Sequence, residues 1–432
     1  MGGGLTILFT NIWLQQYSGS EVVTRDLAVG SLRRGHRPII YTPAIGPVAH
    51  ELIDKGIAVV DDLRLVAEPP DVIHAHHVIP CAEAIIRFPE VLVVNVCHAF
   101  AHWLEAPAHF PQVGAYVAVD EACRDRLVHT EGIDPARVVV LPNAVDMTRI
   151  PPRARSLAER PRRAVAFGKA TLVAQIRAAC EALSIEFATI GPHAGLEVAH
   201  PERELVGFDL VFASARAALE GLCCGCAVIV CDERGSAGLV TPDNFAALRA
   251  NNFGLRSLTT PVSTEGLIEQ VRRYDPDDAR RVCERARREA DLEKVLDAFD
   301  LLYGQVMSGA RASPVRRDAH EAAVARFLHA YLPRRPNDPR WPWLAERQVL
   351  DGRIAELESR LADAARELEQ RSVAGRAAAE LERARTDFRA AELEQARTDL
   401  RAAEQRLAII KRSRLLKLGR WLRRFRGLPL PY

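Results

Sequence analysis

The feature that most constrains the fold is a series of short apolar runs, rich in β-branched residues, separated by segments with helical spacing. In residues 1–150, a helix is predicted from Glu21 to Arg34, where Gly35 ends it. Strands that are apolar along their whole length are covered on both faces, which predicts a parallel sheet between helices. The strand candidates of this part are Leu5–Phe9, Pro38–Tyr41, Val72–Ile73, Val91–Val96, Tyr116–Val119 and Val138–Leu141.

A second series of the same kind follows a Pro- and Arg-rich linker at residues 151–163. A long helix from Pro276 to Met307, with a break near Ala290, closes this series. We therefore expect two α/β domains, residues 1–150 and 164–308, with a ligand cleft at the carboxyl ends of their strands. The strand candidates of the second domain are Ala164–Phe167, Glu186–Ile190, Leu210–Phe212 and Ala227–Val230.

The remaining residues differ in composition from both domains. Residues 309–343 are rich in Pro and Arg and are expected to form a linker or adaptor. Residues 344–410 contain no Pro, follow heptad spacing between Ile354 and Leu368, and then repeat a segment of 12 residues. This pattern favours a long helix that self-associates as a coiled coil with a phase shift, and a solitary solvated helix is the alternative.

The last segment, residues 411–432, holds eight basic residues and no acidic ones. Leu415, Leu418, Leu422 and Phe425 fall on one helical face. A basic amphipathic helix of this kind, over Lys411–Arg426, favours contact with an anionic membrane surface. A basic disordered tail or a nucleic-acid contact would leave the apolar stripe without a use.

Composition excludes several classes of protein. The net charge of +2 gives no support to nucleic-acid binding. The nine cysteines form no pair of C-x-x-C modules with zinc-binding spacing, so buried thiols in a reducing cytoplasm are the better interpretation. The first residues lack the basic and long apolar regions of a signal peptide, and no apolar stretch reaches the length of a membrane span. We expect a cytoplasmic protein.

The segment Ala218–Val230 predicts a short helix with one acidic residue, Glu220, then a turn at Gly225 and an apolar strand. A carboxylate in this position could accept hydrogen bonds from the two hydroxyls of a ribose; a helix-surface carboxylate is the alternative. This helix-turn-strand resembles the LEAMACGxPVV signature of family 4 glycosyltransferases, which bind the nucleotide half of a sugar donor there. The resemblance covers residues 5–307 and implies two Rossmann-like domains in the GT-B arrangement, the first facing the acceptor.

Two loops of the first domain carry further parts of the resemblance. Ser18–Glu21 resembles the GGxE loop of the family, which implies that Gly19 and Ser20 let the backbone approach the donor diphosphate. An ordinary turn between strand and helix is the alternative. Leu141–Asp146 resembles the PNGVD motif at the domain junction and implies that Asn143 lies at the donor, with Ala in place of Gly.

The cations that grip the donor phosphates are only partly present. The resemblance implies that Lys169, after the first strand of the second domain, contacts the diphosphate, but the place of a second lysine falls near Ala174. Arg216, behind Ser214 as a helix cap, could supply the missing charge, and an exposed ion-paired arginine is the alternative.

Histidines mark the first domain. His98 ends a strand where family members place a histidine that approaches the sugar, and a neutral imidazole there could donate or accept a proton. A histidine that serves only packing is the alternative. Asp71–His77 resembles the DVIHAHH strand of the family, and strand alternation favours a role in the fold over a metal site.

The main departure is Phe212, which stands eight residues before Glu220 where the family usually has a second Glu. Relatives with a G-R-x-A-L-E type of helix also lack it, and Ala215–Glu220 looks like that type. We expect a retaining glycosyltransferase that moves a hexose-type sugar from a nucleoside diphosphate donor to a glycan or lipid-linked acceptor in cell-surface polysaccharide synthesis, peripheral at the inner face of the plasma membrane, without a metal or cofactor. The alternatives are a nucleotide-sugar epimerase on the same fold and a noncatalytic scaffold.

Overall fold

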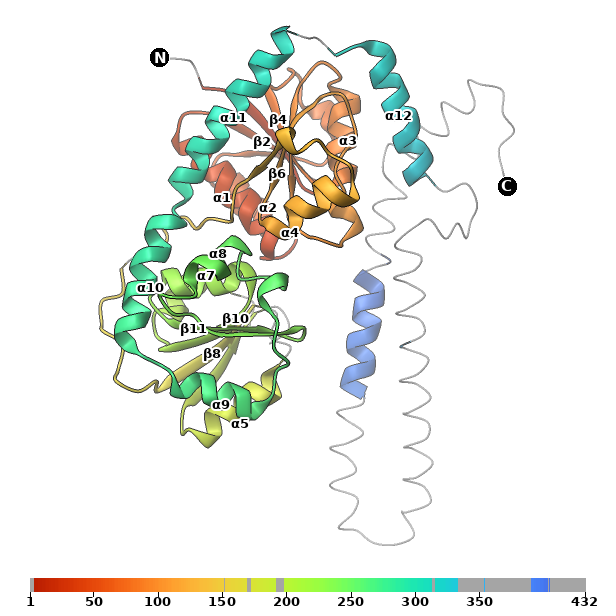
Figure 1. Cartoon of the computed structure of the whole chain (residues 1–432). Helices are drawn as coiled ribbons and strands as arrows, with labels where there is room; N and C mark the ends of the chain where they lie inside the picture. The colour runs from red at the N-terminus through yellow and green to blue at the C-terminus, as the bar shows by residue number, and fades with distance from the viewer. Residues whose placement is uncertain are drawn as a thin grey trace, which may run out of the picture. The chain divides into compact units, whose positions relative to one another are not determined.

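The computed structural model describes residues 4–150, 152–168, 172–191, 198–312, 315–332, 353, 390–402 and 404. The chain divides into two compact units, Met1–Ala323 and Val324–Tyr432. The first unit holds two β-sheets in separate lobes (Figure 1). Residues 390–402 of the second unit are helical, which lies within the expected long helix. The coiled coil and the basic tail otherwise lie outside the described residues.

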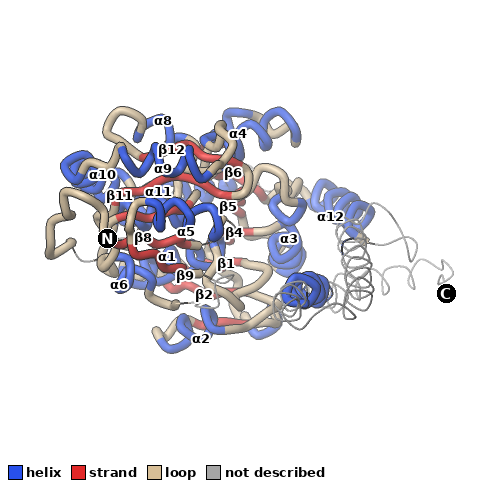
Figure 2. Tube along the Cα trace, turned by 90° about the horizontal axis from the view of Figure 1, so that it is seen from below, coloured by secondary structure: helices blue, strands red, loops and turns tan. Residues whose placement is uncertain are grey.

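The first sheet has seven parallel strands in the order β3-β2-β1-β4-β5-β6-β7. The order reverses between β1 and β4, and such a switch point is where open parallel sheets bind ligands. The strands lie between helices (Figure 2), as their continuous apolar runs predicted. The strands are β1 (Thr6–Thr10), β2 (Arg37–Tyr41), β3 (Ala58–Val60), β4 (Val72–His76), β5 (Val93–Cys97), β6 (Val113–Ala118) and β7 (Val138–Val140).

Helix α1 of the first lobe lies close to the predicted helix Glu21–Arg34. Helix α1 spans Gly19–Arg33, and Gly35 follows with a φ of 83°, a conformation that favours glycine and stops the helix. The others are α2 (Pro47–Asp54), α3 (Val78–Arg87) and α4 (Glu121–Asp125), and a π-helical turn at Arg126–Thr130 continues α4.

The second sheet has five strands in the order β12-β11-β10-β8-β9. Four are parallel, and β12 (Gly235–Leu239) pairs antiparallel with β11, an edge that the sequence pattern did not predict. The others are β8 (Arg163–Phe167), β9 (Glu186–Ile190), β10 (Leu210–Ala213) and β11 (Ala227–Asp232). Side chains alternate along β10, so Val211 packs into the core on one face of the sheet and Phe212 into the core on the other.

Two helices cover each face of the second sheet. Helix α7 (Ala215–Cys223) packs on α10 (Pro276–Glu289), and α5 (Val173–Ala182) packs on α9 (Thr264–Arg272). The short helices α6 (Pro201–Leu205) and α8 (Phe245–Ala250) complete the lobe. The two GT-B-like lobes therefore have the layered α/β construction that the sequence predicted.

The helix expected over Pro276–Met307 is interrupted at Ala290 and Asp291, between α10 and α11 (Leu292–Ala312). Backbone bonds to Val145 hold this break, because the Val145 N–H donates to Ala290 O at 2.8 Å and the Leu292 N–H donates to Val145 O at 3.1 Å. Helix α11 then packs on α1, β5 and β6 of the first lobe (Figure 1). The chain thus returns to the first lobe, and α12 (Arg317–Tyr331) follows.

Candidate functional site

A cavity of about 540 Å³ lies at the carboxyl ends of the strands, with walls from both lobes. The first lobe contributes the loop after β1, with Gly19 and Ser20, and the residues His98 and Asn143 that follow β5 and β7. The second lobe contributes Gly168, the start of α7 and Glu220. The volume suits a small-molecule ligand. Lys169, the predicted phosphate ligand, lies outside the described residues.

Glu220 lies at the wall of this cavity on α7. Its neighbours Leu219 and Leu222 are buried in the core of the second lobe, which turns the carboxylate away from that core. The side chain is 14% exposed, and Nε of Arg216 donates to its Oε1 at 3.0 Å. Burial raises the pKa of Glu220, and the charge of Arg216 opposes this shift. The carboxylate is therefore held in place by Arg216 and still borders the cavity.

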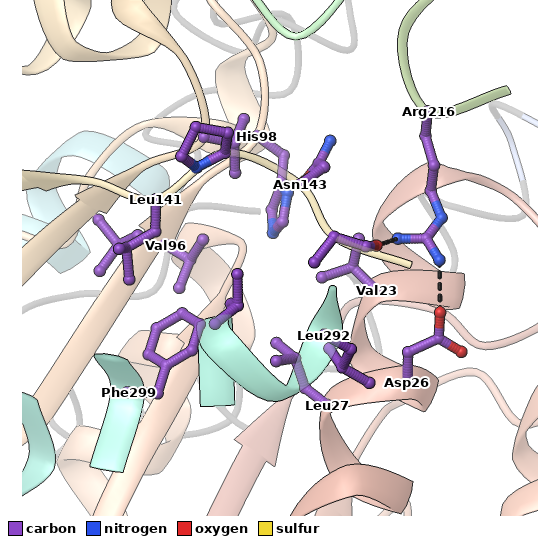
Figure 3. Close-up of a pocket in the computed structure, with 15 residues that line it drawn as sticks. Val23, Asp26, Leu27, Val96, His98, Leu141, Asn143, Arg216, Leu292 and Phe299 are labelled. Carbon is purple, nitrogen blue, oxygen red and sulfur yellow. Dashed lines mark hydrogen bonds and ion pairs between the residues drawn. The ribbon is translucent and has the colours of Figure 1, made fainter. Parts of the chain in front are cut away.

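Arg216 is placed differently from the expectation that it offers a free charge. Its three nitrogens donate to Glu220, to Ala144 O at 2.8 Å and to the carboxylate of Asp26 on α1. Figure 3 shows the guanidinium pointing at Asp26. The side chain is 8% exposed, so Arg216 is neither an exposed arginine nor an uncommitted one.

Asp26 accepts from three arginines that the sequence gave no reason to group. Arg25 donates from Nη2 at 2.8 Å, Arg149 from Nη1 at 3.3 Å, and Arg216 from across the two lobes. The Asp26 side chain is only 3% exposed. Three guanidinium groups from α1, the domain junction and α7 thus meet on one buried carboxylate.

His98 borders both this cavity and a smaller apolar one of about 20 Å³ that Val96, Leu27 and Phe299 also line (Figure 3). Its Nε2 lies 2.6 Å from Nδ1 of His76, and its backbone N–H donates to Glu105 Oε2 at 2.8 Å. Burial lowers the pKa of His98 to about 4, although the charge of Glu105 opposes the shift. At neutral pH His98 is therefore an uncharged imidazole.

The other histidines of β4 and its end serve the packing of the first lobe. Nδ1 of His74 lies 2.6 Å from the Tyr303 hydroxyl on α11, and His77 pairs with Glu105 at 3.3 Å. Burial disfavours the charge of Glu105, yet His77 and His98 hold its pKa at about 2. His74 and His76 lie on one face of β4, two residues apart. Within the described residues no group of three His, Cys, Asp or Glu side chains is arranged to hold a metal ion.

Gly19 opens α1 behind Ser18, and a Cβ at Gly19 would meet no described atom within 4 Å. The described neighbours of this position therefore leave room for a side chain larger than that of glycine. Asn143 lines the cavity while its carbonyl accepts from Arg249 at 2.6 Å. Ala144, which stands where the family motif has Gly, has no positive φ, so the turn does not require glycine.

The start of α7 departs from the expected capping. Ser214 occupies the cap position, but its hydroxyl donates to Asp232 Oδ2 at 2.7 Å and accepts no hydrogen bond from an N–H of the helix. Ala215 has a φ of 52°, a conformation that favours glycine, and its N–H donates to Phe253 O at 2.8 Å. Phe212 is 2% exposed in β10 and is among the residues that line the cavity, so an apolar ring and not a carboxylate stands at that position.

Comparisons with known proteins agree with this geometry. Residues 17–149 match the model of Glycosyltransferase Family 4. No curated protein matches the chain.

Two solved structures have the same fold. A glycosyltransferase from Rickettsia africae ESF-5 is 13% identical, with a TM-score of 0.50 over 70% of this chain and 99% of that one. Anabaena Alr3699/HepE, solved in complex with UDP and glucose, is 15% identical, with a TM-score of 0.50 over 70% of this chain and 100% of that one. The first unit therefore has the GT-B fold of glycosyltransferases.

Proposed function

We propose that the protein is a retaining glycosyltransferase that takes a sugar from a nucleoside diphosphate donor bound in the 540 Å³ cavity. The observation that carries the proposal is the position of Glu220, which borders that cavity on the helix after β10, where a ribose can be held by a carboxylate. The family 4 match of the first lobe and the UDP in the Anabaena structure support a nucleotide-sugar donor.

Each predicted site residue then has a role. Glu220 holds the ribose, Lys169 stabilises the departing diphosphate, and Gly19 and Ser20 border the donor. Neutral His98 orients the sugar through a hydrogen bond, as its lowered pKa supports. Asn143 lines the donor side of the junction between the lobes.

Arg216 was proposed as a second diphosphate ligand. Because its nitrogens are engaged by Asp26, Glu220 and Ala144, it can reach a phosphate only if one of these contacts breaks. A role in positioning the Glu220 carboxylate requires no such change.

Binding of nucleotides is the direct test. Titration calorimetry with UDP, GDP and ADP should show binding of at least one, and Glu220→Gln should weaken it about tenfold or more, because the amide keeps the size but loses the charge. Glu284→Gln is the matched control, since Glu284 is 61% exposed on α10 and ion-paired with Arg280. Absence of binding for all three nucleotides would exclude the proposed donor site.

Phe212 favours a second candidate, a domain that binds the nucleotide without transferring the sugar. The residue at that position is a phenylalanine that packs in the core and borders the cavity, so it offers the donor sugar no carboxylate. Incubation with donor alone and with acceptor glycans separates the candidates: transfer or slow donor hydrolysis supports the enzyme, epimerised donor supports an epimerase, and unchanged donor supports the scaffold.

The acceptor is proposed to be a glycan or lipid-linked sugar, with the protein in the cytoplasm at the inner face of the plasma membrane. In the described residues no helix is long and apolar enough to cross a bilayer. Residues 411–432, whose eight basic residues and apolar stripe support the membrane contact, lie outside the described residues.

We predict that deletion of residues 411–432 releases the protein from liposomes that contain anionic lipid, because the basic stripe supplies the attraction. Co-sedimentation of the full chain with anionic and with neutral liposomes measures it. Equal sedimentation of the full and the shortened chain with anionic liposomes would exclude this surface.

A further inference from the structure

We propose that the guanidinium group of Arg234 binds the outer phosphate of the donor diphosphate. Asp232 and Ser214 hold this guanidinium in place, and the inference rests on the proposed function. Arg234 lies in the two-residue turn between β11 and β12 and lines the cavity beside the start of α7. It is thus placed at the carboxyl end of β11, among the strand ends of the second lobe.

A network of hydrogen bonds locks the guanidinium from one side. Nε of Arg234 donates to Asp232 Oδ1 at 3.0 Å, and Nη2 donates to Oδ2 at 2.5 Å, which is a bidentate pair. The Arg234 N–H donates to the same carboxylate at 2.9 Å, and Ser214 donates from the other side at 2.7 Å. Asp232 is only 4% exposed, whereas Arg234 is 47% exposed. The Asp232 carboxylate therefore holds Nε and Nη2 of Arg234, and Nη1 is left on the side of the guanidinium that borders the cavity.

Arg234 differs from the other arginines of the cavity wall. Arg25, Arg149 and Arg216 are 2%, 23% and 8% exposed, and each is bound to Asp26. Nε of Arg149 has no hydrogen-bond partner in the described residues, but this atom is not accessible to solvent. Nη1 of Arg234 contacts none of the described residues, so this arginine can accept an anion without breaking an existing bond.

Distances along α7 point to the phosphate and not to the ribose. Glu220 and Ala215 are five residues apart, which is about 7.5 Å along a helix. A donor whose ribose lies at Glu220 and whose diphosphate runs toward the start of α7 brings the outer phosphate toward Ser214 and Asp232, and so toward Arg234. The N-terminus of α7 favours negative charge at the same end. Arg234 would supply the cation that the sequence lacks near Ala174.

Calorimetric titration of the full chain with UDP, GDP and ADP, and with the corresponding monophosphates and nucleosides, tests the inference. Arg234→Gln should lower the affinity for the bound diphosphate about tenfold or more and leave the nucleoside affinity unchanged. Arg234→Lys should restore part of the loss. Asp232→Asn should give an intermediate loss, because the guanidinium stays charged but loses its bidentate partner.

Arg163→Gln is the matched control, since Arg163 is 45% exposed and ion-paired with Glu186 in the same lobe, but begins β8 at the amino end of the sheet. Thermal unfolding of every variant checks that it folds. If the wild type binds a diphosphate and Arg234→Gln binds it equally well, or weakens diphosphate and nucleoside alike, the inference is wrong and the proposed function stands. If the wild type binds no nucleotide, both fall.

Discussion

At the scale of single residues, the buried histidines of β4 make the stability of the first lobe depend on pH. Burial lowers the pKa of His74 to about 3 and that of His76 well below its usual value of 6.5. The unfolded chain therefore binds protons that the folded chain does not accept. This difference in proton binding is absent above about pH 6.5, and it destabilises the folded state progressively as the pH falls from there toward the folded pKa values.

Two buried carboxyls act in the opposite direction. Burial raises the pKa of Glu21 and of Glu83 to about 7, so their protonated forms favour the folded state as the pH falls from about 7 to 4.5. The pH dependence of the whole protein is therefore partly cancelled. The contribution of one histidine to the pH dependence of stability is therefore measured by comparing variants.

We predict that His74→Phe, made in a Tyr303→Phe background so that no hydroxyl loses its partner, flattens the pH dependence of stability. Between about pH 6.5 and 5 the background protein should lose about 2 kcal/mol more than the double variant, at about 1.4 kcal/mol per pH unit. Urea unfolding at several pH values measures the difference. Equal slopes for both proteins would show that His74 does not resist protonation.

At the scale of elements, the packing of α1 on α11 depends on a glycine. A Cβ at Gly30 on α1 would lie 2.5 Å from Cδ1 of Leu296, which is 2% exposed on α11. The buried leucine cannot swing into solvent to make room. Helix α11 can therefore pack closely on α1 because Gly30 has no side chain at the point of contact.

We predict that Gly30→Ala and Leu296→Ala are destabilising alone and compensate each other when combined. Overpacking should cost about 1–3 kcal/mol and the cavity about 2–5 kcal/mol, while the double variant should lose less than the sum, because the new methyl group fills space that the leucine leaves. Chemical denaturation of the four proteins gives the coupling. Simple additivity would mean that the two helices do not meet at this point.

Local pattern and tertiary arrangement were predictable to different degrees. Continuous apolar runs such as Val93–Cys97 identified the buried parallel strands, because such a run has to be covered on both faces. β12 was missed because Gly235–Leu239 contains no β-branched residue. The break at Ala290 could be predicted weakly from the sequence. The packing of α11 on the first lobe could not, because an apolar helix face does not specify which element covers it.

For the candidate site too, some features could be predicted from the sequence and others could not. The larger cavity is lined by Glu220, His98, Gly19, Ser20, Asn143 and Arg216, and the roles of these residues there stay predictions. The partners of these residues were not predictable. Asp26 and Arg216 are 190 residues apart, and their contact depends on how two lobes meet, which no local pattern encodes.

At the scale of the whole molecule, the two lobes are joined by a buried ionic centre and by exposed ion pairs. Asp26 on α1 binds Arg149 at the junction and Arg216 on α7, deep between the lobes. Asp125 on α4 binds Arg256 of the second lobe at a more exposed place, where both side chains are more than 30% exposed. Solvent screens the second contact far more than the first.

We predict that Asp26→Asn destabilises the first unit by about 3–5 kcal/mol, because three arginines would lose the buried carboxylate that they share, and their separate partners Glu51, Glu202 and Glu220 would not replace it. Asp125→Asn, which also removes an acid between the lobes, should cost about 1 kcal/mol or less. Denaturant unfolding followed by fluorescence compares the two variants.

The same variants should differ in nucleotide binding. Because Arg216 also holds Glu220, the loss of Asp26 should release the Glu220 side chain and weaken nucleotide binding, whereas Asp125→Asn should not. Equal costs for the two variants would mean that the buried ionic centre contributes no more to stability than a surface contact.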